Sequence, residues 1–141
     1  MHDRAMTELK IDLNEDREDF KPGEELLGNI SWDLDKPVHA LELRLFWFTR
    51  GKGTEDAGIV QAMKFEQPVP QETRPFRFRL PDAPYSFSGQ LISLVWALEL
   101  IAYPSKDMTR RELIMAPDGK EVRLESVPAS GMATLWISKK C

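Results

Sequence analysis

Side chains that could act as an acid or a base are few in this chain. With His2 at the N-terminal end, His39 is the one imidazole placed for acid–base chemistry, near the start of a predicted strand. Glu99 is the one carboxylate inside the apolar run 91–103, where burial would suit a general acid. The same glutamate can instead point to solvent or pair with an arginine on a neighbouring strand. We favour this structural interpretation and expect no catalytic residue.

Two other patterns carry part of a known chemistry. Tyr85-Ser86-Phe87-Ser88-Gly89 offers serine hydroxyls but lacks the Gly-x-Ser-x-Gly spacing of a nucleophile elbow, so both serines are expected to pack a turn. Asp12-x-Asn14-x-Asp16 has the opening spacing of a calcium-binding loop. However, Arg17 stands where that loop needs glycine, and Gly23 replaces the bidentate glutamate. We therefore expect a solvated acidic loop, no metal and no cofactor.

Arginines are the better candidates for binding. Arg74, Arg77 and Arg79 are closely spaced, and together with Arg110 and Arg111 they could line a cationic groove for a phosphorylated or acidic partner. A solvated sheet face is the alternative. The residues expected to contact a partner are Arg74, Arg77, Arg79, Tyr85 and Phe87.

Composition excludes several classes of function. The 141 residues carry a formal net charge of -4, so no positive field exists to gather nucleic acid. The single cysteine, Cys141, allows no intrachain disulfide, which indicates a reducing compartment. The N-terminus lacks the apolar core of a secretory signal, and the longest apolar run is shorter than the roughly 20 residues that span a bilayer. We expect one cytoplasmic domain over 1–141, with residues 1–6 as a flexible tail.

The sequence pattern predicts that short β-strands position these side chains. Apolar residues alternate with polar ones, as at Leu9, Ile11 and Leu13, and turns such as Pro22-Gly23-Glu24 separate the segments. A helix is the alternative for 90–103, but β-branched residues and the flanking Gly89 and Pro104 favour a buried strand. Loops are expected at 50–58 and 81–89. The predicted strands cover 9–13, 26–34, 41–48, 59–65, 76–80, 90–103, 112–116, 120–127 and 132–138.

About nine strands with little or no helix predict an all-β, antiparallel, two-sheet sandwich of immunoglobulin-like type. Three tryptophans, Trp32, Trp47 and Trp96, fall on alternating apolar faces and are expected in its core, whereas Trp136 is expected at an exposed edge. A lone sandwich leaves sheet edges unpaired, so self-association through these edges is also expected.

The order of several motifs resembles the N-terminal domain of the arrestin-like superfamily. These motifs are the Pro22-Gly23-Glu24 turn with Gly28, then Phe76-x-Phe78-x-Leu80-Pro81, then Pro84-Tyr85-Ser86-Phe87-Ser88-Gly89 before a strand with Val95-Trp96. The superfamily includes arrestins, their domain-containing relatives, a retromer subunit and bacterial sporulation-control proteins. The resemblance covers about residues 7–103 and implies an arrestin-type sandwich that associates with proteins.

This chain also departs from the arrestin pattern. Arrestins pair two such domains, and a lysine pair in their first strand meets phosphate, whereas the corresponding region here is acidic around the lone Arg17. Phosphate sensing therefore does not carry over. We expect a non-catalytic adaptor or scaffold that binds protein partners through an exposed strand edge or through the loops at 50–58 and 81–89. The alternatives are a small-molecule or carbohydrate-binding sandwich, which needs exposed aromatic residues on its concave face, and, ranked last, a small enzyme using His39 or a carboxylate.

Overall fold

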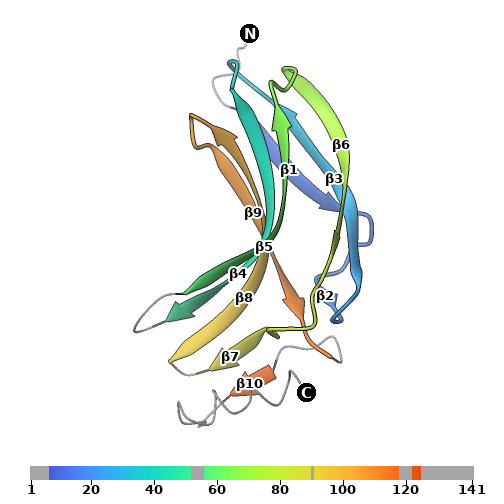
Figure 1. The fold of residues 1–141 in the computed structure, drawn as a ribbon, viewed down its shortest axis with the longest axis vertical. Coiled ribbons are helices and arrows are strands. Elements are labelled where there is room, and N and C mark those ends of the chain that lie inside the picture. Colours follow the sequence, from blue (N-terminus) through green and yellow to red (C-terminus); the bar gives the residue numbers. More distant parts are fainter. Residues whose placement is uncertain (1–6, 52–55, 90, 118–121, 125–141) are drawn as a thin grey trace.

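The structure is a computed structural model that describes residues 7–51, 56–89, 91–117 and 122–124. Two β-sheets pack face to face in its upper part. Below, the ends of the strands over residues 40–51, 57–66 and 92–103, which belong to one sheet, diverge from the other sheet (Figure 1). The described strands are β1 (Glu8–Leu13), β2 (Asp19–Phe20), β3 (Glu25–Asp33), β4 (Ala40–Gly51), β5 (Ala57–Glu66), β6 (Gln71–Arg79), β7 (Phe87–Gly89), β8 (Ile92–Tyr103), β9 (Met108–Met115) and β10 (Val122–Leu124).

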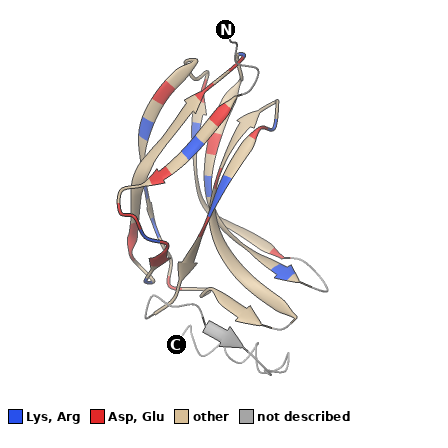
Figure 2. Ribbon diagram, turned by 180° about the vertical axis from the view of Figure 1, so that it is seen from behind, with Lys and Arg blue, Asp and Glu red and all other residues tan. Residues whose placement is uncertain are grey.

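The small sheet has the order β1-β3-β6, and both of its pairings are antiparallel. Its strands form because apolar residues recur every second position: along β3, Leu26, Gly28, Ile30 and Trp32 are buried, while the alternate residues 27, 29 and 31 are more exposed. The outer face therefore carries most of the charged and polar residues of the three strands, with Glu72 and Arg74 of β6 as exceptions on the other side. Figure 2 shows these charged positions along the small sheet.

Two glycines permit the sharp features of this sheet. Gly23 has a φ of +80°, which confirms the expected turn that leads into β3. Gly28 lies where β3 passes β1 so closely that a Cβ would collide with the carbonyl oxygen of Asp12 and approach Phe76 to 2.9 Å. Glycine is required at the first position by backbone conformation and at the second by space.

The large sheet is built around β8. One edge of β8 pairs with β4, which in turn pairs with β5; the other edge pairs first with β7 and then with β9. Two short parallel pairs, β2 with β9 and β7 with β10, interrupt an otherwise antiparallel arrangement. The strand expected over 90–103 is confirmed as β8 over Ile92–Tyr103, and its burial on both faces explains why its sequence is almost continuously apolar.

The core lies between the two sheets. Leu43, Leu45, Leu98 and Leu100 are fully buried on the inner face of the large sheet, and Trp96 lies among them. The indole Nε1–H of Trp96 donates to the carbonyl of Pro84 at 2.7 Å, so its polar atom is satisfied.

The other tryptophans follow the expectation where they are described. The indole Nε1–H of Trp32 donates to the carbonyl of Val69 at 2.8 Å, and Trp47 packs against the core from its margin. The position of Trp136 lies outside the described residues, as do 1–6 and the expected strand at 132–138.

Several elements differ from expectation: β6 begins at Gln71 instead of residue 76, and β7 lies within the loop expected at 81–89. The loop placed at 50–58 is wrong at both ends, because β4 continues to Gly51 and β5 begins at Ala57; Thr49 and Asp56 also bond through their backbones. The strand expected at 112–116 begins at Met108, since it pairs with β8 along Trp96–Ile101. Finally, β2 and β7 are too short to show an alternating pattern in sequence.

Candidate functional site

The arginines predicted to share one groove lie on three different surfaces. Arg77 and Arg79 are on the outer face of β6, in register with Leu27 and Glu25 of β3. Arg74 is offset by an odd number of residues, so it faces the other side of the strand, where its guanidinium lies 5.2 Å from the ring of Phe65 on β5.

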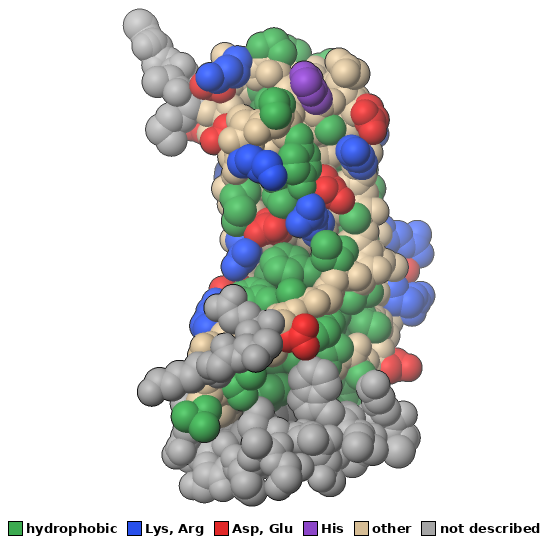
Figure 3. Space-filling view, turned by 60° about the vertical axis from the view of Figure 1, so that its left-hand side comes forward, with side chains coloured by type: hydrophobic (Ala, Val, Ile, Leu, Met, Phe, Trp, Pro, Cys, Tyr) green, Lys and Arg blue, Asp and Glu red, His purple; other side chains and the backbone are tan. Residues whose placement is uncertain are grey.

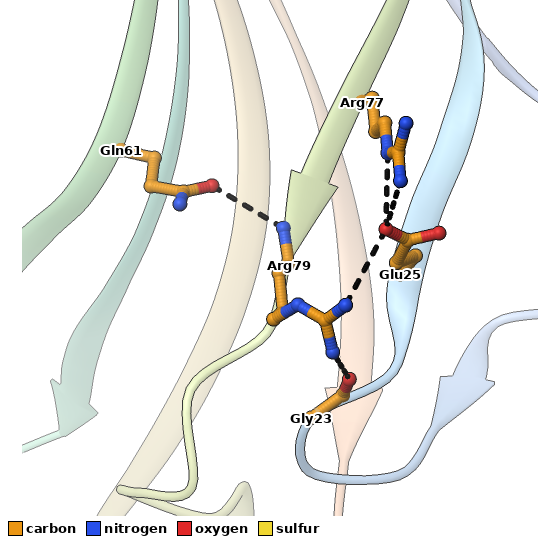
Figure 4. Close-up of polar contacts among 5 residues, drawn as sticks. All are labelled: Gly23, Glu25, Gln61, Arg77 and Arg79. Carbon is orange, nitrogen blue, oxygen red and sulfur yellow. Dashed lines mark hydrogen bonds and ion pairs between the residues drawn. The ribbon is translucent and has the colours of Figure 1, made fainter.

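Arg77 and Arg79 share a single carboxylate oxygen. Arg77 donates to Glu25 Oε2 from Nε at 3.0 Å and from Nη2 at 2.8 Å, and Arg79 Nη2 lies 3.6 Å from the same oxygen (Figure 4). Arg79 Nη1 also donates to the carbonyl of Gly23 at 2.9 Å. The two side chains are 71% and 66% exposed, so this pair presents one cationic charge beyond what Glu25 balances. We call Arg77 and Arg79 the cationic pair.

The loop residues do not join the cationic pair. Phe87 is buried in the core, so it packs the sandwich and offers no surface to a partner, contrary to the expectation for this residue. Tyr85 is partly buried against the same core. Ser86 is buried, and its Oγ accepts the backbone N–H of Met115 at 2.9 Å, which confirms a packing role for this serine.

Arg110 belongs to the large sheet. Its Nε and Nη2 donate to Glu99 Oε2 at 3.2 and 2.8 Å. Glu99 is buried, and its carboxylate is matched by an arginine on a neighbouring strand, as the sequence suggested. Arg111, one residue further, lies on the opposite face of β9, in register with Leu98.

A second polar cluster lies nearby on the same outer face. Arg44 Nη2 donates to Tyr103 Oη at 2.8 Å, and the Tyr103 hydroxyl donates to Glu42 Oε1 at 3.2 Å. Burial raises the pKa of Tyr103 above its ordinary value, and the hydrogen bond and charge of Glu42 act in the same direction, while Arg44 opposes them.

Two phenylalanines on this outer face were not predicted as site residues. Because Leu45 points into the core and β4 pairs with β8 without a break in register, Phe46 and Phe48 point outward. Their ring centroids are 5.7 Å apart and the rings are stacked. The Arg110 guanidinium lies 5.3 Å from the Phe46 centroid and 4.9 Å from that of Phe48, and Arg50 lies 5.3 Å from Phe48.

These four side chains form an alternating series of aromatic rings and guanidiniums, which we call the Phe–Arg ladder: Phe46, Arg110, Phe48 and Arg50. A hollow of about 660 Å³ adjoins it, and Asp56 and Ala57 also line this hollow. Figure 3 shows apolar side chains gathered in the hollowed middle of this face, with charged side chains above them. The sequence indicates this site only through the end of β4, where apolar residues occupy both faces. The contact of these residues with arginines depends on the register of three strands, β4, β8 and β9.

The candidate acid–base and metal residues remain apart. His39 is exposed, and its backbone N–H donates to the Tyr103 carbonyl at 2.8 Å. In the acidic loop, Arg17 forms ion pairs with Glu15 and Glu24 and lies over the ring of Phe20. Among the residues that the structure describes, no group of three or more acidic, histidine or cysteine side chains could hold a metal ion.

The sequence matches no protein-family model and no curated protein. Its structure is similar to that of the sporulation control protein Spo0M from Bacillus subtilis, with a TM-score of 0.55 and 18% identity. The fold is arrestin-like. The match covers 79% of this chain and 50% of Spo0M, so the arrestin-like sandwich here spans half the length of that protein. At this identity the likeness concerns the fold alone. Within the described part of this arrestin-like chain, no helix is long and apolar enough to cross a membrane.

Proposed function

We propose that this chain is a non-catalytic interaction module, an adaptor or scaffold of arrestin-like fold, that binds a protein partner with an acidic surface in the cytoplasm. The observation that carries the proposal is the cationic pair. Two exposed guanidiniums share Glu25, so several of their N–H donors remain available to a partner's carboxylates.

The chemistry of the remaining polar residues supports a binding role over catalysis. Glu99 is held by Arg110 and Ser86 accepts a backbone bond, whereas His39 is exposed just before β4 and has no part in the cationic pair. Glu99 and Ser86 therefore stabilise the sandwich itself. A rigid sheet face with a few exposed arginines is suited to recognition, since the scaffold fixes where the donors point.

The backbone around the cationic pair is fixed on both sides. The Arg79 N–H donates to Gln61 Oε1 of β5 at 3.3 Å, and the Leu80 N–H donates to the carbonyl of Glu24 at 2.9 Å. The end of β6 is thus tied to both sheets (Figure 4). A partner would meet guanidiniums whose main chain does not need to be ordered on binding.

The test is a quantitative pull-down from lysate of the source cells with the wild type and the Arg77→Ala/Arg79→Ala variant. Binding is measured at about 0.1 M and about 1 M salt, where the Debye length falls from about 10 to about 3 Å. We expect a stoichiometric partner that is retained by the wild type at low salt, lost at high salt, and reduced about tenfold by the double variant.

The matched control is Lys64→Ala/Arg74→Ala, which removes the same charge from side chains that do not face the cationic pair. Lys64 pairs with Glu66 at 3.8 Å, and Arg74 lies over Phe65. Equal loss of the partner in both double variants would show that net charge, and not the cationic pair, determines binding. If both double variants retain the partner, the cationic pair is not the binding surface.

A further inference from the structure

The Phe–Arg ladder is an unusual feature for the outer face of a sandwich. Side chains there normally meet solvent, yet Phe46 and Ala97 are buried on this side of the large sheet. The guanidinium of Arg110 covers Phe46, and Glu99 holds this guanidinium in place from below. The ladder is therefore ordered before any partner arrives, which lowers the entropic cost of binding.

The charges of this face are nearly balanced. Arg110 is matched by Glu99, and Arg50 donates to Glu112 Oε2 at 2.5 Å. Asp56 adds one carboxylate to the lining of the hollow. An acidic segment would gain nothing here, because each guanidinium already has its own carboxylate and the surplus is negative. The face is complementary to a neutral or basic segment.

The planar guanidiniums and phenyl rings of the ladder indicate which kind of side chain can bind there. Side chains of Arg50 and Arg110 are 56% and 36% exposed, and the hollow beside the ladder is large enough for a single aromatic side chain. A guanidinium that rests on one ring can accept a second ring on its open side. An indole can also donate its N–H to Asp56, which leucine and phenylalanine cannot do.

We propose that the outer face of the large sheet is a docking surface for an aromatic side chain, tryptophan in particular, carried by a neutral or basic partner segment. The ring stacks on Arg50 and Arg110 beside Phe48, and its N–H donates to Asp56. This surface is separate from the cationic pair and recognises the opposite kind of charge, so it does not rest on the acidic partner proposed above.

The test is an NMR titration of the full chain with N-acetyl-L-tryptophanamide, observed at the side-chain Nε–H resonances of its arginines. We expect saturable ring-current shifts at Arg50 and Arg110, and binding about fivefold weaker for N-acetyl-L-phenylalaninamide, which lacks the donor. N-acetyl-L-leucinamide should give no saturable shift. Equal responses to the tryptophan and leucine amides would overturn the proposal.

Variants separate the surface from the fold. Phe48→Leu keeps an apolar side chain but removes the ring, and Asp56→Ala removes the acceptor together with the bond that Asp56 Oδ1 accepts from the Ala57 N–H. Each variant is expected to bind the tryptophan amide about fivefold more weakly or worse. Arg77→Ala/Arg79→Ala should bind as the wild type does. Undiminished binding to Phe48→Leu, whose backbone spectrum reports whether it is folded, would contradict the proposal. Saturable shifts with maltotriose and none with the tryptophan amide would also overturn it and assign this face to saccharides.

Discussion

At the scale of single residues, the ion pair between Glu99 and Arg110 links the sheet to the ladder above it. The carboxylate is buried while the guanidinium is about one-third exposed, so solvent screens one partner only. We expect Glu99→Gln to lower the free energy of unfolding by about 1–3 kcal/mol, because Arg110 loses its charged acceptor. Urea denaturation measures the change.

A double-mutant cycle with Arg110→Met isolates the pair. If the interaction is direct, the double variant is less destabilised than the sum of the two single variants. Additive losses would show that the two residues contribute independently, and the positioning role given to Glu99 would fail.

Tyr103 gives a prediction about alkaline pH. Its pKa is raised, chiefly by burial and further by Glu42, so the neutral phenol is favoured in the folded state. The protonated phenol therefore stabilises the folded state below the ordinary tyrosine pKa of about 10. This stabilisation is lost as the pH rises through the higher pKa of Tyr103 in the folded chain. Tyr103→Phe should therefore lose less stability than the wild type above about pH 10.

The measurement for Tyr103 is chemical denaturation across that range, with the ultraviolet absorbance of tyrosinate as a second readout. The chain has two tyrosines, and Tyr85→Phe leaves only Tyr103 to titrate. A single transition at the ordinary pKa in that variant would contradict the expected shift.

Residue parity predicts part of the arginine arrangement from the sequence alone. In a strand, Arg74 must face the opposite side from Arg77 and Arg79, because odd separations reverse the side chain. Their separation into two surfaces was therefore predictable from spacing alone. The contact of Arg110 with Phe46 and Phe48 was not, since it requires the register of β9 against β8 and of β8 against β4.

At the scale of elements, Gly28 and Gly23 are glycines for different reasons and should respond differently to alanine. Gly28→Ala places a Cβ against the backbone of β1, which cannot move without disturbing the β1–β3 pairing, so we expect a loss of about 3 kcal/mol. At Gly23 no atom lies within 4 Å of a Cβ, and only the positive φ opposes alanine, at about 1 kcal/mol. Thermal or urea unfolding compares them; equal losses would contradict this distinction.

Most strands were predictable because one of their faces is buried. Period two located β1, β3, β4, β5 and β6, and β-branched residues with flanking turns identified β8 despite a pattern that also suits a helix. The short strands β2 and β7 are set by partners distant in sequence: β2 pairs with the end of β9, and β7 with the start of β8. No local pattern of two or three residues carries that information.

At the scale of the whole molecule, the sheet edges differ in how well they are protected. β6 ends the small sheet and carries Pro75, which has no N–H to offer a further strand. β5 ends the large sheet in the described chain and contains no proline. The Gln67 N–H donates to the His39 carbonyl, so Gln67 and every second residue before it direct their backbone groups toward β4. The residues between them, Ala62, Lys64 and Glu66, direct their backbone N–H and C=O groups toward the free edge.

We therefore expect self-association, and we expect it through β5. Ile59 is 59% exposed on this strand, and Lys64, a charge that would discourage pairing, has Glu66 at 3.8 Å. Ile59→Lys should weaken association about tenfold in sedimentation equilibrium, because the dimer would place two lysine charges, one from each chain, beside the paired β5 edges. Leu91→Lys is the control, since Leu91 is 68% exposed but precedes β8, away from this edge. A wild-type mass that stays monomeric at every concentration would refute edge pairing. Equal weakening by both variants would place the contact elsewhere on the apolar surface.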